Sequence, residues 1–157
     1  MTHIIHSDNY YDYQKNLSSS DSIIHGYASV FNVVDNHNDV VIRGAFQDSI
    51  KEFEAGKIIP ILWQHYQDRP IGLIEKIEED DHGLYISGRI LNDVTQGKEA
   101  MSLIKSQVIC GFSIGYNVSN YKLDYDTDIR LIYKIDLWEI SVVTFPANAE
   151  TLITAVN

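Results

Sequence analysis

The segment 111–116 places a serine hydroxyl on a strand face that is otherwise stripped of side chains. It consists of Gly111-Phe112-Ser113-Ile114-Gly115-Tyr116. Alternate residues of a strand face opposite ways, so Ser113 shares its face with the two glycines. Glycine inside a strand often marks the close approach of another backbone, and a peptide lying across this face could reach Ser113. The alternative is a tight packing site under a helix, with Ser113 as a small filler.

The same letters match G-x-S-x-G, the nucleophile elbow of α/β-hydrolases, but the rest of the chain does not fit that fold. In those enzymes the catalytic histidine follows the serine. Here all six histidines precede it: His3, His6, His25, His37, His65 and His82. The chain also lacks the alternation of strands and helices that a doubly wound sheet requires. We therefore exclude the α/β-hydrolase fold.

A nucleophilic serine needs a base, and His65 is the best candidate. It ends the apolar run 61–65, at the edge between a strand and a loop. A histidine there can be partly buried and still reach a cleft, which suits general-base catalysis. The alternative is a surface histidine at a strand edge. His25, in a strand, and His82, in an acidic turn, are interpreted as structural or solvated.

Glu139 is a carboxylate in an apolar strand, where it is costly unless it is paired. Its neighbours on the predicted strand face are Leu137, Ser141 and Val143. A histidine would be a fitting partner, because the third member of a catalytic triad holds the imidazole and stabilises its charged form. The alternative is a glutamate on an edge strand that faces water, with Asp136 as a second candidate for the acid.

Two other groups are weaker candidates for chemistry. Asp35, His37 and Asp39 form a polar cluster, but their spacing matches no metal-binding loop. Cys110 lies on the bulky face of its predicted strand and is expected to be a small buried apolar residue rather than a nucleophile. It is the single cysteine, which excludes an internal disulfide. We expect neither a metal nor another cofactor.

The elements that must position these residues are mostly strands. Runs of β-branched and aromatic residues predict strands at 23–31, 58–63, 71–77, 84–91, 108–118, 129–134 and 136–145. The acidic run 78–82 is expected to be the solvated tip of a hairpin, and 65–70 a polar loop.

Two helices are predicted from the spacing of apolar residues. Phe46, Ile50 and Phe53 predict a helix over 45–55 that ends at Gly56. The apolar positions of the second helix, which begins near residue 92 or 93 and is weakened by Gly97, are Val94, Met101, Ile104 and Val108.

Six or seven strands with two helices, in no alternating order, indicate a β-rich α+β domain. A closed or strongly curved β-barrel is favoured, because it leaves few exposed strand edges. A length of 157 residues suits one domain over 22–157. Residues 1–21, with several tyrosines and serines, are predicted to be a flexible arm.

Composition excludes several classes of function. Twenty-two acidic residues against twelve Lys and Arg give a net charge of −10, which excludes nonspecific binding to nucleic acid or anionic lipid. No apolar run approaches the roughly 18 residues of a membrane span. The first 21 residues lack the basic start and apolar stretch of a secretory signal. We expect a soluble, cytoplasmic protein.

Taken in order, these segments resemble the prohead (capsid maturation) protease family of HK97-like tailed bacteriophages. The resemblance spans residues 23–156. The segments are GYASVF at 26–31, DVV at 39–41, GAF at 44–46, ILWQH at 61–65, PIG at 70–72, GL at 83–84, GFSIGY at 111–116 and DLWEISVVTFPAN at 136–148.

The resemblance implies a fold related to the herpesvirus assemblins, a closed β-barrel ringed by helices. It implies a serine endopeptidase inside the procapsid, in the host cytoplasm, that cuts the scaffold (delta) domain from the major capsid protein and also cuts itself. The family's serine falls on Ser113, its histidine on His65 and its acidic residue on Glu139. The herpesvirus enzymes use a second histidine in that third role, and their activation by dimerisation suggests a weak homodimer here.

Two alternatives remain open at this point. One is a non-catalytic capsid assembly factor on the same fold, which would hold scaffold through its acidic surface and tyrosine-rich arm. The other is a small esterase that uses Ser113.

Overall fold

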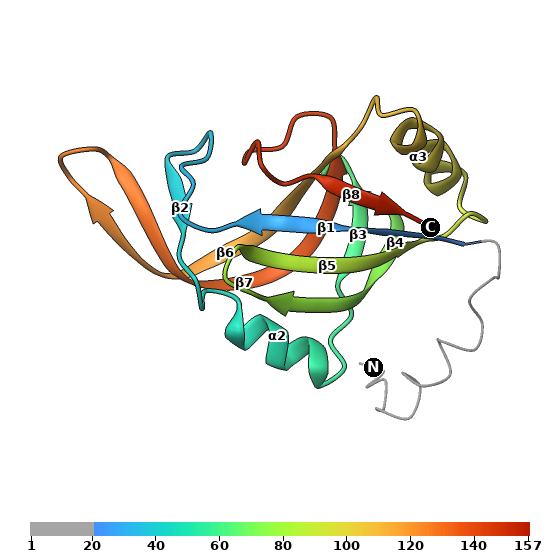
Figure 1. The fold of residues 1–157 in the computed structure, drawn as a ribbon. Helices are drawn as coiled ribbons and strands as arrows, with labels where there is room; N and C mark the ends of the chain where they lie inside the picture. The colour runs from blue at the N-terminus through green and yellow to red at the C-terminus, as the bar shows by residue number, and fades with distance from the viewer. Residues whose placement is uncertain (1–20) are drawn as a thin grey trace.

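The computed structural model describes residues 21–157, in which eight strands form one strongly curled sheet (Figure 1). The predicted arm, 1–21, lies outside the described residues except for Asp21 and stays a prediction. The strands are β1 (Ser22–Val30), β2 (Asp39–Val41), β3 (Pro60–Trp63), β4 (Tyr66–Glu79), β5 (Gly83–Ile90), β6 (Gly111–Asp124), β7 (Ile129–Val143) and β8 (Ile153–Val156). The helices are α2 (Gln47–Glu54) and α3 (Thr95–Lys105).

The sheet curls until the start of β6 meets the segment that leads into β8. The order is β2-β7-β3-β4-β5-β1-β8, and β6 pairs with β7 along its whole length. The Phe112 N–H donates to the Thr151 carbonyl at 2.9 Å, and the Ile153 N–H donates to the Cys110 carbonyl at 2.8 Å. These bonds join the start of β6 to the segment that enters β8. The predicted β-rich, strongly curved α+β fold is therefore confirmed.

Both predicted helices are present and slightly shorter than predicted. Phe46 is fully buried, with Ile50 and Phe53 packed against the same core. Gly56 has a φ of +104°, the left-handed conformation that ends helices. In α3, a Cβ on Gly97 would lie 2.5 Å from the Leu91 carbonyl oxygen. This glycine, which weakens the helix by propensity, therefore lets α3 pack closely against the chain that leaves β5.

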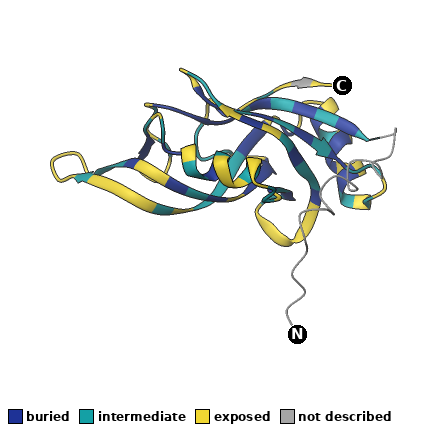
Figure 2. Cartoon of the chain, turned by 90° about the horizontal axis from the view of Figure 1, so that it is seen from below, coloured by how far each residue is buried: buried dark blue, intermediate teal, exposed yellow. Residues whose placement is uncertain are grey.

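Apolar side chains fill the curl of the sheet, whereas the outer part of the β6–β7 hairpin is exposed (Figure 2). The largest fully buried side chains include Ile24, Phe46, Ile86, Phe112, Ile135 and Leu137. Among residues 21–157, no helix is long and apolar enough to span a membrane.

Several predicted boundaries were wrong. The candidates 129–134 and 136–145 are one strand, β7, because β6 pairs with it throughout. β4 begins at Tyr66, so the predicted loop 65–70 is mostly strand. β8 was not predicted. Val108 is exposed, because α3 ends at Lys105. Cys110 is exposed rather than buried, because it precedes the first paired residue of β6 and the predicted alternation does not extend to it.

The acidic hairpin tip is more than a solvated loop. Glu79 accepts hydrogen bonds from the N–H groups of Gly44 at 3.1 Å and Phe46 at 2.9 Å, just before α2. Asp80 accepts from the Gly83 N–H at 2.9 Å and from the Tyr27 hydroxyl at 2.5 Å. Two of these acids therefore tie the hairpin to α2 and β1.

We expect Tyr27→Phe to destabilise the fold at neutral pH and to have little effect in acid. The Tyr27 hydrogen bond is the largest cause that lowers the pKa of Asp80, and it raises the pKa of Tyr27 to about 12. A carboxyl with a lowered folded-state pKa contributes stability above its unfolded pKa of about 3.9, and this contribution is lost as pH falls through the folded value. Urea unfolding of both proteins from pH 7 to pH 2 measures the difference.

The control for this prediction is Tyr125→Phe, at an exposed position between β6 and β7. It should leave the unfolding free energy unchanged at every pH. A difference between wild type and Tyr27→Phe that stays constant down to pH 2 would contradict the role given to Asp80.

Candidate active site

His65 lies in a two-residue turn that joins β3 to β4. Trp63 pairs with Tyr66, so Gln64 and His65 are the two central residues. Their φ angles are +52° and +61°. Positive φ at both positions is the mark of a type I′ turn, which normally uses Asn or Gly. Non-glycine residues in this conformation carry a cost, so the surrounding structure must hold them there.

Four hydrogen bonds hold this turn against the end of β7. The Gln64 N–H donates to the Val142 carbonyl at 3.0 Å, and the His65 N–H donates to Ser141 Oγ at 3.0 Å. The Gln64 side-chain amide donates to Thr144 Oγ1 at 2.6 Å and accepts from the Thr144 N–H at 3.2 Å. The position of His65 is therefore fixed by a neighbouring strand that is remote in the sequence.

The structure brings His65 and Glu139 together. His65 Nδ1 lies 2.5 Å from Glu139 Oε1. The second oxygen, Glu139 Oε2, accepts a hydrogen bond from Ser141 Oγ at 2.7 Å. The Glu139 side chain is 12% exposed, whereas the His65 side chain is 44% exposed. The buried carboxylate is thus paired, and the histidine ring keeps one side open to the solvent.

Glu139 shares a strand face with Ser141, as predicted, but a β-bulge moves Leu137 to the other face. Gly115 pairs with Glu139, but Tyr116 pairs with Leu137, so Trp138 is an extra residue in β7. The bulge shifts the alternation by one. Leu137 belongs to the hydrophobic core, on the opposite face from Glu139. The prediction that these two residues share a face was wrong.

The glycines beside Ser113 make room for side chains of the same protein. A Cβ on Gly115 would overlap Glu139 Oε1, and a Cβ on Gly111 would lie 2.9 Å from the Pro146 ring. The predicted close approach is therefore present, but a carboxylate and a proline ring make it, rather than another backbone or a helix.

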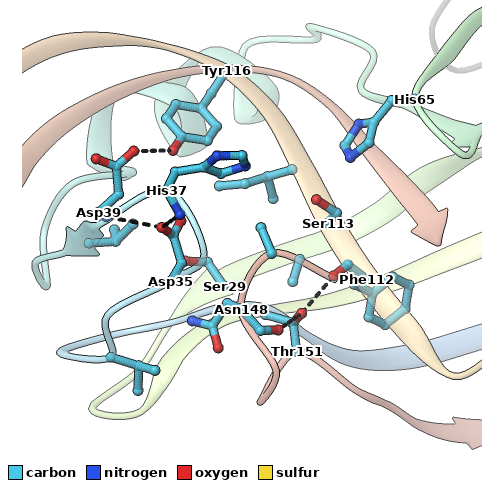
Figure 3. Close-up of a pocket in the computed structure, with 15 residues that line it drawn as sticks. Ser29, Asp35, His37, Asp39, His65, Phe112, Ser113, Tyr116, Asn148 and Thr151 are labelled. Atoms are coloured by element: carbon cyan, nitrogen blue, oxygen red, sulfur yellow. Dashed lines mark hydrogen bonds between the residues drawn. The ribbon is translucent and has the colours of Figure 1, made fainter. Parts of the chain in front are cut away.

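Ser113 faces the same pocket as His65 (Figure 3). The cavity has a volume of about 120 Å³, and Ser113 lies opposite Ser141 in the β6–β7 register. Within residues 21–157, no hydrogen bond joins the Ser113 hydroxyl to another protein group, His65 included. Of the three predicted site residues, His65 and Glu139 are in contact, and Ser113 lines the same pocket as His65.

The polar cluster around Asp35 forms another wall of this pocket. Asp35 Oδ1 accepts from the His37 N–H at 2.7 Å and from the Asp39 N–H at 3.0 Å. Asp39 is buried and makes two hydrogen bonds with Arg130, at 2.7 and 2.6 Å. Burial, followed by the charge of Asp39, raises the pKa of Tyr116 to about 12. The cluster holds His37 at the pocket (Figure 3), and sequence reasoning missed this placement.

The remaining candidates have other partners. Asp136 accepts from Trp138 Nε1 at 2.9 Å and from Lys57 Nζ at 3.2 Å, and these bonds lower its pKa, that to Trp138 most. His25 Nε2 lies 3.3 Å from the side-chain nitrogen of Asn157. Among the described residues, no group of three or more His, Cys, Asp or Glu is arranged to hold a metal ion.

Solved structures with related folds come from phages and herpesviruses. The bacteriophage T4 capsid assembly protease superposes with a TM-score of 0.62 at 14% identity, over 77% of this chain and 80% of that one. The KSHV protease, in complex with a hexapeptide phosphonate inhibitor, superposes with a TM-score of 0.56 at 10% identity, over 88% and 65%. The predicted herpesvirus protease-like fold is confirmed.

Sequence relatives are phage proteins. The prohead protease of Enterobacteria phage HK97 is 30% identical over 136 residues, which cover 86% of this chain and 60% of that protein. A protein of Pseudomonas phage PAJU2 called a capsid polyprotein is 34% identical over 106 residues, 63% of this chain and 16% of its own length. Residues 9–157 match the family described as Caudovirus prohead serine protease. This chain belongs to the family of Caudovirus prohead serine proteases.

Proposed function

We propose that this chain is the serine endopeptidase of a phage procapsid, which removes the scaffold domain of the major capsid protein and also cleaves itself. The observation that carries the proposal is the 2.5 Å contact between His65 Nδ1 and Glu139 Oε1 beside the pocket that Ser113 lines. The capsid polyprotein relative, in which a matching segment occupies part of a capsid protein, supports the choice of substrate.

Ser113 is the proposed nucleophile and His65 the general base. The bond to Glu139 keeps a proton on Nδ1, which leaves Nε2 free to accept the proton of the Ser113 hydroxyl. The Ser113 oxygen then attacks the peptide carbonyl and forms a tetrahedral intermediate. His65 returns the proton to the leaving amine as the C–N bond breaks. Water, deprotonated by His65, then attacks the acyl-enzyme, and His65 returns that proton to the Ser113 oxygen as the ester C–O bond breaks.

The hydrogen bond from Ser113 to His65 is proposed to form when substrate fills the pocket. Catalytic hydrogen bonds are often long in the free enzyme and tighten in the complex. The absence of this hydrogen bond within residues 21–157 is therefore compatible with the proposed mechanism. The weak homodimer that the resemblance implies remains part of the proposal.

Covalent labelling with a fluorophosphonate probe tests this proposal without knowledge of the cleavage sequence. The probe reacts with an activated serine, so we expect one adduct per chain, located on Ser113 by peptide mass spectrometry. Absence of an adduct, or an adduct on another serine, would contradict the proposed nucleophile and favour the non-catalytic assembly factor.

Glu139→Gln should slow the labelling of Ser113 without abolishing it. An amide at this position carries no charge to stabilise the imidazolium and can select the wrong tautomer of His65. The corresponding loss in serine proteases is about 10⁴-fold in rate, less than the loss of the serine itself. The second-order rate constant of fluorophosphonate inactivation, compared between wild type and Glu139→Gln, measures this loss.

The control is Glu75→Gln, which removes a carboxylate that pairs with Arg89 outside the pocket. Gly115→Ala provides an independent check, because its Cβ would displace the Glu139 carboxylate. When Gly115→Ala is added to Glu139→Ala, the labelling rate should fall little further, because both changes act on the Glu139 carboxylate. A fully additive loss, or a wild-type rate in Glu139→Gln, would contradict the role of Glu139.

A further inference from the structure

We propose that Ser141 is a positioning residue for the active site, whose single hydroxyl fixes both the base and the acid. This inference rests on the proposed function of Ser113, His65 and Glu139. Ser141 lies on β7 and has no exposed surface. Its Oγ accepts from the His65 N–H at 3.0 Å and donates to Glu139 Oε2 at 2.7 Å.

The Ser141 hydroxyl acts as both a donor and an acceptor. A serine hydroxyl has one proton and two lone pairs. Because a carboxylate can only accept, the proton of Ser141 is committed to Glu139, and a lone pair is left for the His65 N–H. Alanine provides neither bond.

The backbone conformation of His65 explains why its bond to Ser141 matters for the direction of the ring. Its φ of +61° is unfavourable for a residue other than glycine, and its ring is partly exposed. The direction of the ring therefore depends on how the backbone of the turn is held. Ser141 is the partner that holds the His65 amide, and Gln64 is held separately at the Val142 carbonyl.

Glu139 depends on Ser141 for a different reason. Its Oε1 faces His65, and burial of an ionised carboxylate is costly unless both oxygens are paired. The Ser141 hydroxyl supplies the second bond and so sets the rotation of the carboxylate about its axis. Ser141 lies opposite Ser113 in the strand register, so the common anchor of the base and the acid lies directly across from the proposed nucleophile.

The chain offers a matched buried serine that contacts neither His65 nor Glu139. Ser49, in α2, is 2% exposed. Its Oγ donates to the Ile135 carbonyl at 2.9 Å and accepts from the Leu137 N–H at 3.0 Å. Ser49→Ala therefore removes the same number of hydrogen bonds from the same strand, at similar burial, without touching His65 or Glu139.

The experiment compares fluorophosphonate inactivation of wild type, Ser141→Ala and Ser49→Ala. We expect Ser141→Ala to lower the maximal inactivation rate about 10- to 100-fold, with little change in the half-saturating probe concentration, because misplacement of catalytic groups by about 1 Å costs this much. Ser49→Ala should lower thermal stability but keep the wild-type rate. Ser141→Cys, which keeps a side chain of the same shape but with a larger atom and a weaker donor, replaces Ser141→Ala if the alanine variant does not fold.

The outcomes separate this inference from the proposed function. If wild type is not labelled at Ser113, the proposed function fails, and this inference fails with it. If wild type is labelled and Ser141→Ala reacts at the same rate, Ser141 has only a structural role and this inference alone is wrong. Equal rate losses in Ser141→Ala and Ser49→Ala would likewise overturn it.

Discussion

Ser113→Ala is expected to abolish cleavage of the cognate capsid protein and of the chain itself. A methyl group cannot attack a carbonyl, and loss of the serine of a catalytic triad costs about 10⁶-fold in rate. The substitution should leave the fold intact, because the Ser113 hydroxyl makes no hydrogen bond within residues 21–157. The measurement is the amount of truncated product per unit time, read by intact-mass spectrometry.

The matched control is Ser119→Ala, at an exposed position on the same strand. It should process substrate at the wild-type rate. Cleavage by Ser113→Ala at the wild-type rate would show that the nucleophile lies elsewhere.

His65→Asn should reduce the rate by a similar factor, about 10⁶-fold, because the base and the nucleophile act as one unit. Asparagine is chosen because it tolerates the left-handed conformation that His65 adopts at a φ of +61°. The turn can therefore persist while the proton acceptor is lost. Fluorophosphonate labelling of Ser113 and thermal unfolding of the same sample measure the two effects separately.

The control for the base is His25→Asn on β1, outside the pocket. It should keep wild-type labelling. Retention of labelling in His65→Asn, with the protein folded, would show that another group activates Ser113.

The strands and helices could be predicted because their signals are local. The helix face formed by Phe46, Ile50 and Phe53 repeats at helical spacing, and Gly56 ends it in the expected conformation. The short strands β2 and β8, of three and four residues, carry too little pattern to be identified. β7 was divided in two because the polar residues Lys134 and Asp136 interrupt its apolar pattern, whereas pairing with β6 continues across them.

The candidate site was only partly predictable, because long-range geometry builds it. The isolation of Ser113 between two glycines and the anomaly of Glu139 are visible in the sequence. The bulge at Trp138 is not, and it moves Leu137 to the face opposite Glu139. The turn at His65 was predicted as part of a longer loop because Gln and His are unusual in such a turn.

Ser141 shows most plainly what a sequence cannot reveal. In an apolar strand it resembles a small core residue. Its role follows only from the bonds that its hydroxyl makes to His65 and Glu139, residues that lie 76 and 2 positions away along the chain.

Co-expression of this chain with its cognate capsid protein, wild type beside Ser113→Ala, tests the central claim most directly. We predict that intact-mass spectrometry will show a defined truncation of the capsid protein with wild type and full-length capsid protein with Ser113→Ala. Normal shells with no truncation in either case would contradict the protease and favour an assembly factor on the same fold.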